Sequence, residues 1–357
     1  MKILLVGGTG LISGELARAF VQANHEVVII TDGKGSLPAP AGVCGHLIAD
    51  RNDSSSIRRA LQEAPFRKWD AVVDSVAFDA SGARALLTAL QASRPHTFVI
   101  STSFVYSPRV RQPISPQADT GSLAELGAYA FGKASMEQVW ASAEQYPFTI
   151  LRIPHTLAPG SDLGAVPLHN RDPYLIARLQ AGLPLYLADG GRQSLQVVWA
   201  ADVAATVLKA IGRTTTFAKA YNCAHPEILT GRSYCELVAE LTGVPLRVRA
   251  FPVEALWASK WGWNLCTIPR VLDLTSLVED IGYIPSTSPR DSIFRCLRAA
   301  PSPSEGTYDP SFANVQSIVS ESQDQIAKEL TALAASRARG TIDARMNSEP
   351  LPRWNDC

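Results

Sequence analysis

The chain has 357 residues, of which 46% are hydrophobic and 18% charged, a composition typical of a soluble globular protein. Its 33 basic and 33 acidic residues cancel to a formal net charge of zero, which excludes a general electrostatic attraction to nucleic acid or to an anionic membrane. The six cysteines show no Cys-x-x-Cys spacing, so they predict neither a metal site nor a redox pair. We expect reduced thiols, a cytoplasmic location, and no signal peptide or membrane anchor.

The first residues predict a dinucleotide-binding βαβ unit. An apolar run of strand length, residues 2–6, leads into a turn that contains Gly7 and Gly10. Glycines suit a tight turn, and they let a pyrophosphate approach bare backbone amides at a helix N-terminus. The third glycine of the Gly-x-x-Gly-x-x-Gly pattern is replaced by Ser13, with Gly14 one place late, and the alternative is an ordinary loop. Apolar residues at helical spacing follow the turn: Ile12, Leu16, Ala19, Phe20 and Ala23.

Strand-like runs then alternate with helical segments, a pattern that predicts a parallel sheet of the doubly wound, Rossmann-type α/β class. The runs are residues 26–31, 46–49, 70–76, 97–101 and 148–153. We predict a nucleotide-binding domain over residues 1–154, its sheet completed by later segments. A smaller substrate lobe is expected over residues 155–300, interleaved with the sheet, followed by a tail of unassigned role over residues 301–357.

Two segments carry side chains suited to proton transfer. Tyr129 and Lys133 are four residues apart, which places them on one face if the segment is helical. A phenol with a pKa near ~10 is a poor base, but a neighbouring positive charge favours its phenolate form. Lys133 would also donate to a nicotinamide ribose. The alternative is an amphipathic helix with a half-buried Tyr. Upstream, residues 98–106 read as a strand that ends in a hydroxyl-rich turn, where a ligand would bind.

Together these motifs resemble the extended short-chain dehydrogenase/reductases, the group of NAD-dependent sugar epimerases and dehydratases. The resemblance is carried by residues 7–10, Asp50, residues 101–106, the Tyr129 and Lys133 pair, and residues 151–154. Their order and spacing follow that group from residue 1 to about residue 298, including residues 199–204 and 281–285.

The resemblance implies roles for individual residues. Tyr129 is the expected acid/base, Lys133 its partner, and Thr102 the catalytic hydroxyl, with Ser103 as the fallback. Asp50 would lie near the adenine, or else cap a strand end, and Arg152 is either part of the loop over the nicotinamide or structural. The full set expected to bind the cofactor is Gly7, Thr9, Gly10, Leu11, Ile12, Asp32, Asp50, Arg51, Lys133 and Pro154.

Departures from the group's pattern bear on the cofactor. Thr31 stands where members that use NAD have an acid, and Asp32 stands where members that use NADP have an Arg. The Asp32 carboxylate would repel a 2′-phosphate and accept from a ribose hydroxyl, which favours NAD. Lys34 could pair with the phosphate, so NADP remains an alternative.

Other departures bear on the substrate. Leu195 occupies the place where nucleotide-sugar epimerases of this type have an Arg for the substrate pyrophosphate. Candidates to replace it are Arg192, Arg171, Arg178 and Arg270. Ser103 and Phe104 replace the Asp-Glu of the 4,6-dehydratases, which excludes that subtype. His155 is a candidate substrate contact or a loop histidine, and three tryptophans are either lid or packing residues: Trp257, Trp261 and Trp263.

The leading hypothesis is an enzyme that transfers a hydride between NAD and a hydroxyl or keto carbon of a small sugar-like or cyclic substrate. The sequence leaves epimerisation and simple oxidation or reduction equally open. The competing reading is a noncatalytic NAD(P)-binding sensor or RNA-binding relative on the same scaffold. We also expect a homodimer. An apolar stripe would supply its helix face or else face the core: Ala134, Met136, Val139, Trp140 and Ala143.

Overall fold

The computed structural model describes residues 1–35, 37–161, 163, 175–180, 182–251, 253, 268–299, 328 and 332. The chain divides into two compact units. The first comprises Met1–Ala158, Gln196–Glu227 and Val271–Pro289, and the second comprises Pro159–Leu195, Ile228–Arg270 and Arg290–Cys357. Arg171, the tryptophans at 257, 261 and 263, and all of the 301–357 tail except Lys328 and Ala332 lie outside the described residues. Domain boundaries at 154 and 300 stay predictions.

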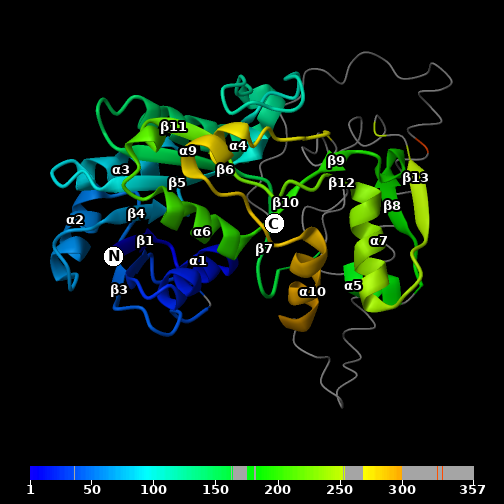
Figure 1. The fold of residues 1–357 in the computed structure, drawn as a ribbon, viewed down its shortest axis with the longest axis horizontal. Helices are drawn as coiled ribbons and strands as arrows, with labels where there is room; N and C mark the ends of the chain where they lie inside the picture. Colours follow the sequence, from blue (N-terminus) through cyan, green and yellow to red (C-terminus); the bar gives the residue numbers. More distant parts are fainter. Residues whose placement is uncertain are drawn as a thin grey trace. The chain divides into compact units, whose positions relative to one another are not determined.

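The first unit is built on a sheet of seven parallel strands (Figure 1). In spatial order they are β11 (Lys219–Asn222), β6 (Phe148–Ile153), β5 (His96–Thr102), β4 (Ala71–Asp74), β1 (Lys2–Val6), β2 (Glu26–Thr31) and β3 (Gly45–Ile48). The chain runs outward from β1 to β3 and then returns to β4 on the other side of β1. The predicted doubly wound parallel sheet is therefore confirmed, with its switch point between β1 and β4, where such folds bind ligands.

The strands form here because their residues are apolar on both faces. Residues 3–6 of β1 and all four residues of β4 are buried, as expected for central strands covered by helices on each side. The register pairs Val6 with Ile30 of β2 and with Asp74 of β4. These three strands therefore end level with one another, and their carboxyl ends meet at one edge of the sheet.

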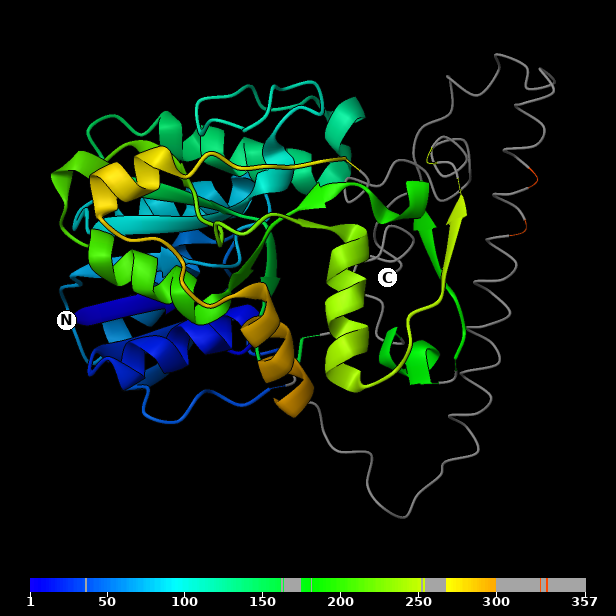
Figure 2. The same ribbon diagram turned by 45° about the vertical axis from the view of Figure 1, so that its right-hand side comes forward.

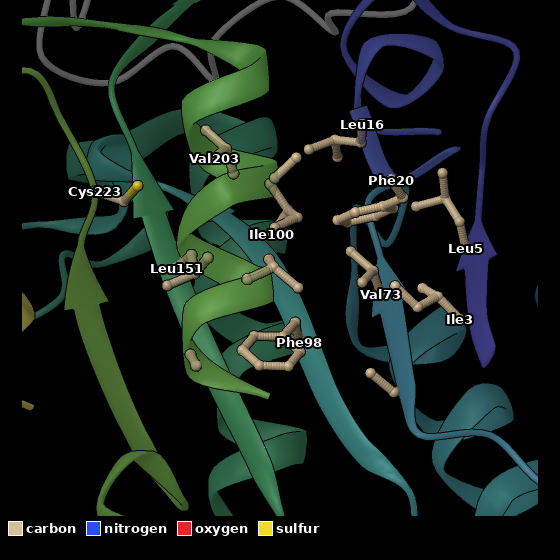
Figure 3. Packing of buried hydrophobic residues seen from close by; sticks show 14 of the residues in the cluster. Ile3, Leu5, Leu16, Phe20, Val73, Phe98, Ile100, Leu151, Val203 and Cys223 are labelled. Atoms are coloured by element: carbon tan, nitrogen blue, oxygen red, sulfur yellow. The ribbon is translucent and has the colours of Figure 1, made fainter. Parts of the chain in front are cut away.

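Helices cover both faces of the sheet. On one face lie α1 (Leu11–Gln22), α6 (Ala200–Ala210) and α9 (Thr275–Ile281), and on the other lie α2 (Ser54–Glu63), α3 (Ala80–Leu90) and α4 (Leu123–Ala141). Figure 3 shows the first core, in which Leu16 and Phe20 of α1 approach Ile3, Leu5 and Val73 of the sheet. All five are fully buried. Burying a side chain of this size stabilises the fold by roughly 1.5–3 kcal/mol.

The apolar stripe of α4 belongs to the second core. Met136 and Trp140 are fully buried and pack with residues of β5 and β6, and Val139 and Ala143 lie against the same cluster, while Ala134 is 3% exposed. Of the two interpretations left open by the sequence, the core-facing one is correct for these residues. A homodimer through another surface stays a prediction.

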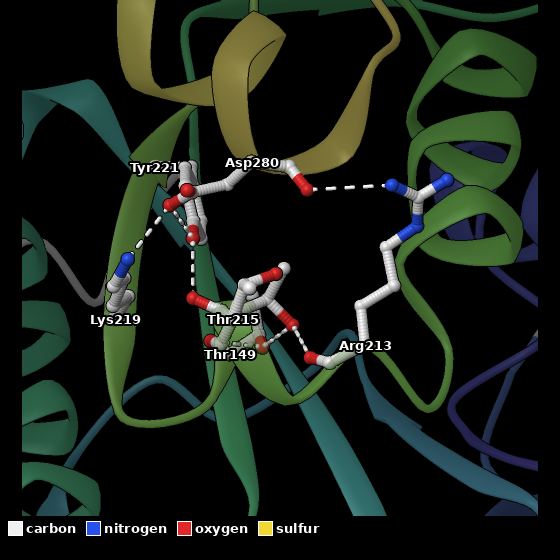
Figure 4. A network of polar contacts seen from close by, with 7 residues as sticks. Thr149, Arg213, Thr215, Lys219, Tyr221 and Asp280 are labelled. Atoms are coloured by element: carbon white, nitrogen blue, oxygen red, sulfur yellow. Dashed lines mark hydrogen bonds and ion pairs between the residues drawn. The ribbon is translucent and has the colours of Figure 1, made fainter.

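A polar network fixes the edge strand β11 (Figure 4). Lys219 Nζ and Tyr221 Oη both donate to one carboxylate oxygen of Asp280 on α9, at 2.8 and 2.6 Å. Arg213 donates to the Asp280 carbonyl at 3.4 Å. It lies just before the short 3-10 helix η3 (Thr214–Thr216). The network connects the edge strand β11 to α9, so the late segment 271–289 packs against the edge of the sheet.

The remaining elements are short. The first unit also contains η1 (Ser103–Val105) and the pair β7 (His155–Leu157) and β10 (Val197–Trp199). The second unit contains α5 (Leu175–Gln180), β8 (Leu185–Ala188), η2 (Asp189–Gly191), β9 (Ser194–Leu195), β12 (Leu229–Thr230), α7 (Gly231–Thr242) and β13 (Val248–Phe251), and nearly all of α10 (Pro289–Ala299). In this unit β13 pairs with β8, beside α7 in Figure 2. Arg290 of α10 forms an ion pair with Glu240 of α7 at 2.7 Å.

Among the described helices, none combines the length and the apolar character needed to cross a bilayer. The cytoplasmic location stays a prediction.

Candidate active site

The glycine turn after β1 requires bare backbone at two positions. Gly7 and Gly8 have φ angles of 108° and 120°, which residues with a side chain rarely adopt. A Cβ on Gly7 would lie 2.5 Å from Ser75 Oγ, and one on Gly8 would lie 2.6 Å from Ile29 Cγ2. Only glycine therefore fits at these two positions of the turn, which leads into the N-terminus of α1, the kind of place where an anionic group such as a pyrophosphate binds.

Ser13 gains a function at the place where the motif lacks a glycine. Gly10 is the N-cap of α1 but has no side chain to cap it, and its amide donates to Ser13 Oγ at 3.0 Å. A Cβ on Gly14 would meet Gly8 O at 3.4 Å, an ordinary contact. The hydroxyl is therefore accommodated as a cap, and Gly14 is not needed for close packing.

A pocket of about 360 Å³ opens at the carboxyl ends of β1, β2 and β4. Of the residues expected to bind the cofactor, Thr9, Asp32 and Arg51 line it. The remainder of the lining is mostly apolar: Val6, Ile30, Thr31, Ala49, Asn52, Ile57, Val76, Phe78, Asp79 and Leu86.

Asp50 is not among the lining residues. Its carboxylate accepts from the Asn52 amide at 2.9 Å, and its own amide donates to Ser56 Oγ at 3.0 Å. These contacts fit the capping of the strand end that was the alternative for Asp50, and its contact with an adenine stays a prediction.

The loop after β2 folds back on the glycine turn. Asp32 is exposed, and its Oδ1 accepts from the Lys34 amide at 3.0 Å. A Cβ on Gly35 would lie 2.6 Å from Thr9 Oγ1, so the loop backbone lies directly against the turn. Thr31 and Asp32, where β2 ends, belong to the pocket lining together with Thr9 of the turn.

The expected catalytic hydroxyls stand where β5 ends. Thr102 is the last residue of β5 and Ser103 opens η1, and they are only 5% and 2% exposed. Thr102 Oγ1 accepts from the Phe104 amide at 3.2 Å. This bond fixes the orientation of the Thr102 side chain at the carboxyl edge of the sheet.

Helix α4 supplies Tyr129 and Lys133. The helix is interrupted at Gly127, whose φ and ψ of 71° and 174° are not helical, and it resumes before Tyr129. Tyr129 is 44% exposed, whereas Lys133 is 4% exposed. The Lys133 ammonium donates to the Ile100 carbonyl of β5 at 2.9 Å.

The ring of Phe78 gathers the charged and phenolic groups of the site. Lys133 Nζ lies 5.0 Å from the ring centroid and the Arg51 guanidinium carbon 5.5 Å from it. The Tyr129 ring centroid is 6.3 Å away. Phe78 itself is half exposed and lines the pocket, whereas Tyr129 and Lys133 are not among the residues that line it. The structure thus brings Arg51, Tyr129 and Lys133 together.

Arg152 of β6 forms a buried ion pair with Glu137 of α4, the helix that carries Tyr129 and Lys133. Its guanidinium donates to both carboxylate oxygens of Glu137, with the shortest contact at 2.6 Å, and to Pro116 O at 2.8 Å. The side chains of the pair are only 8% and 6% exposed. Ser101 also donates to Glu137. The structural reading of Arg152 is therefore the one that its contacts support.

The expected substrate contacts fall in different units. His155 opens β7 in the first unit, directly after Pro154, whose carbonyl accepts from Thr156 Oγ1 at 3.0 Å. Arg192 is exposed and follows η2 in the second unit, which also contains Arg178, Leu195 and the buried Arg270.

Three site residues were missed from the sequence: Gly8, Asp74 and Phe78. Asp74 is 2% exposed at the end of β4, and its Oδ1 accepts from the Val76 and Ala77 amides at 3.2 and 3.0 Å. The sequence carried one usable signal for two of them: Asp74 ends an otherwise apolar strand run, and the aromatic Phe78 follows it four residues later.

Comparison with known proteins agrees with this geometry. The model of the NAD dependent epimerase/dehydratase family matches residues 3–224. The 2′-dehydrokanamycin reductase of Streptomyces kanamyceticus is 24% identical over 298 residues, which are 82% of this chain and 76% of the relative. The chloroplast stem-loop binding protein of 41 kDa b of Arabidopsis thaliana is 24% identical over 256 residues, 68% of this chain and 64% of the relative.

A solved structure shows the same fold. The Bordetella bronchiseptica enzyme WbmG in complex with NAD and UDP has a TM-score of 0.67 at 19% identity, covering 83% of this chain and 93% of its own. The family match spans well over half of the chain and contains the glycine turn, the pocket and the Tyr129 and Lys133 pair. The chain therefore belongs to the NAD dependent epimerase/dehydratase family, the extended short-chain dehydrogenase/reductases, and is a nicotinamide-dependent oxidoreductase of that group.

Proposed function

We propose that the protein reduces or oxidises a hydroxyl or keto carbon of a small, cyclic, sugar-like substrate, with Tyr129 as the acid/base. The observation that carries this proposal is the juxtaposition of an accessible phenol and a buried ammonium around Phe78, next to the end of β5. A dinucleotide is supported by the glycine turn between β1 and α1 and by the pocket beside it, which Thr9, Asp32 and Arg51 line.

Each residue has a distinct task in this scheme. A bound nicotinamide supplies or accepts the hydride. Tyr129 donates its phenolic proton to the carbonyl oxygen during reduction and takes it back during oxidation. The Lys133 ammonium stabilises the phenolate that this transfer leaves. The Thr102 hydroxyl, with Ser103 next to it, holds the reacting oxygen in place.

Charge in the pocket supports NAD in preference to NADP. The Asp32 carboxylate belongs to the pocket wall, where it would repel a 2′-phosphate and could accept from a ribose hydroxyl. Arg51 is the cation in the same lining, but its guanidinium lies over Phe78 and adds to the potential around the buried Asp74. Its contacts favour an internal role for Arg51 over phosphate binding.

The substrate class rests on two observations. The relative from Streptomyces kanamyceticus is named a 2′-dehydrokanamycin reductase. Leu195 stands where a cation for a nucleotide pyrophosphate is expected, which disfavours nucleotide sugars. We therefore favour reduction of a cyclic keto sugar over nucleotide-sugar epimerisation.

The test is turnover of 2′-dehydrokanamycin and other cyclic keto sugars with NADH, followed by the loss of absorbance of the reduced cofactor. Tyr129→Phe should lower kcat/KM by at least ~100-fold, the usual contribution of a positioned acid, while NADH affinity is unchanged. Tyr221→Phe is the matched control, because it removes a phenol from the polar network at the sheet edge. Wild-type turnover by Tyr129→Phe would refute the assigned role.

A second candidate is RNA binding, favoured by the similarity to the chloroplast stem-loop binding protein. Against it stands the formal net charge of zero, since phosphate contacts require an excess of Lys and Arg. Binding of a stem-loop RNA with a steep dependence on salt, together with no turnover of any keto sugar, would favour this candidate over the enzyme.

A further inference from the structure

We propose that Asp74 is a positioning residue whose carboxylate keeps Lys133 in its ammonium form beside Tyr129. The inference deepens the proposed function and rests on it for its catalytic meaning. Its electrostatic part concerns only the folded chain, so it can be tested in the absence of substrate and cofactor.

The strand register brings the two groups together. Asp74 is the last residue of β4 and pairs with Val99 of β5. Lys133 Nζ donates to the carbonyl of Ile100, the next residue along β5. Neighbouring strands lie about 4.7–4.9 Å apart. The Lys133 ammonium is therefore bound to β5, the strand directly beside β4, which carries the Asp74 carboxylate. The amides of Val76 and Ala77 fix the carboxylate in the turn that follows β4.

Burial makes a counter-charge necessary. Loss of hydration lowers the pKa of Lys133 to about 8, and the Asp74 charge is the largest influence opposing that shift. Glu137, on the same helix, opposes it to a smaller extent, whereas Arg51 from the loop after β3 adds to it. The contact from β5 is the Ile100 carbonyl. Burial also raises the pKa of Asp74, and the positive charges of Arg51 and Lys133 counteract that rise.

The consequence is chemical. With a pKa of about 8, Lys133 is roughly 90% protonated at pH 7, and an ammonium there favours the Tyr129 phenolate. An opposite charge close by typically shifts a pKa by about 1–3 units. Without the Asp74 charge, the pKa of Lys133 would be lower, a smaller fraction of it would be protonated at neutral pH, and the phenolate would lose its stabilising partner.

The experiment measures the protonation of Lys133 by NMR of ¹⁵N-labelled lysine side chains in the full chain, with no ligand added. Lys133→Arg assigns the signal. In Asp74→Asn, which keeps an oxygen able to accept from both amides, the midpoint should fall by about one unit or more from its wild-type position. Asp53→Asn is the matched control: it makes the same change at the N-cap of α2 and should leave the midpoint in place.

A second variant tests the opposite direction. Arg51→Gln removes the cation that lowers the Lys133 pKa, so the midpoint should rise. A midpoint that stays at its wild-type value in Asp74→Asn would overturn the proposal. If Asp74→Asn does not fold, Arg51→Gln decides, and an unchanged Lys133 midpoint in that variant would contradict the electrostatic account.

Catalysis supplies a separate readout. On a keto sugar that is turned over, the alkaline limb of the kcat/KM profile should move to lower pH in Asp74→Asn by the same amount as the NMR midpoint. If Tyr129→Phe remains active while the NMR midpoint still moves, the proposed function fails but the link between Asp74 and Lys133 stands. If the midpoint does not move while Tyr129→Phe is inactive, the inference about Asp74 fails alone.

Discussion

His96 makes the stability of the fold depend on pH in a predictable way. The residue opens β5 and is 6% exposed, with its ring 4.2 Å from that of Phe98 and 4.7 Å from that of Phe217. Its Nδ1 accepts from the Gly212 amide at 3.1 Å. Nε2 lies 2.8 Å from Thr149 Oγ1, which in turn donates to Thr216 O. Both nitrogens are satisfied by a neutral imidazole with its proton on Nε2, and a second proton would break the bond from Gly212.

The size of the effect follows from the pKa. Burial lowers the pKa of His96 from 6.5 to about 4. The folded state therefore binds fewer protons than the unfolded state between these values, so the stability contribution is complete above pH 6.5 and is lost as the pH falls toward 4. A shift of about 2.5 units corresponds to about 3 kcal/mol in total, of which about 2 kcal/mol is already lost at pH 5.

The assay is equilibrium urea unfolding at pH 8 and at pH 5, followed by tryptophan fluorescence. His96→Gln lowers stability at both pH values, but it lacks the titration. Between pH 8 and pH 5 the wild type should therefore lose about 2 kcal/mol more than the variant. His46→Gln, on the exposed side of β3, should lose as much as the wild type. Equal losses in the wild type and in His96→Gln would refute the reasoning.

Three further variants test the pocket, the buried ion pair and the turn. Asp32→Ala should raise the affinity for NADP by about tenfold and leave that for NAD within severalfold, as measured by cofactor fluorescence; no gain would contradict the repulsion argument. Glu137→Gln leaves the Arg152 guanidinium buried without its counter-charge, so the free energy of unfolding in urea should fall by about 3–5 kcal/mol. A fall of less than about 1 kcal/mol would mean that the pair is solvated. Gly8→Ala should abolish cofactor binding, because its Cβ meets Ile29, whereas Gly14→Ala should bind normally; equal effects in calorimetry would refute the steric assignment.

The sheet was predictable because its signal is carried by local runs. Residues 3–6 and 27–30 are apolar on both faces, as expected for central strands of a covered sheet, and the strands occur where the sequence predicts them. The orientation of α4 was not predictable in the same way. A stripe such as Met136 and Trp140 has the same period whether it faces a sheet or a second subunit, and only the tertiary contacts decide between them.

The site was predictable where a motif has fixed spacing. Tyr129 and Lys133 come together because one helical turn separates them. Phe78 could not be found in this way, since its position over Lys133 arises from the packing of α3 and α4: a Cβ on Gly132 would lie 2.5 Å from the Phe78 carbonyl. Contacts between elements distant in sequence carry no periodic signal.

Asp32 and Asp74 show what the pattern leaves undetermined. Both follow apolar runs, and both lie at the same edge of the sheet. Asp32 lies beyond the last residue of β2, where it is exposed and can act on a ligand through its charge. Asp74 is still inside β4, paired on both sides, so its charge is buried and acts on Lys133. Asp32 lies one residue past the end of its strand and Asp74 is the last residue of its own, and this difference places the first carboxylate in the pocket lining and buries the second in the sheet.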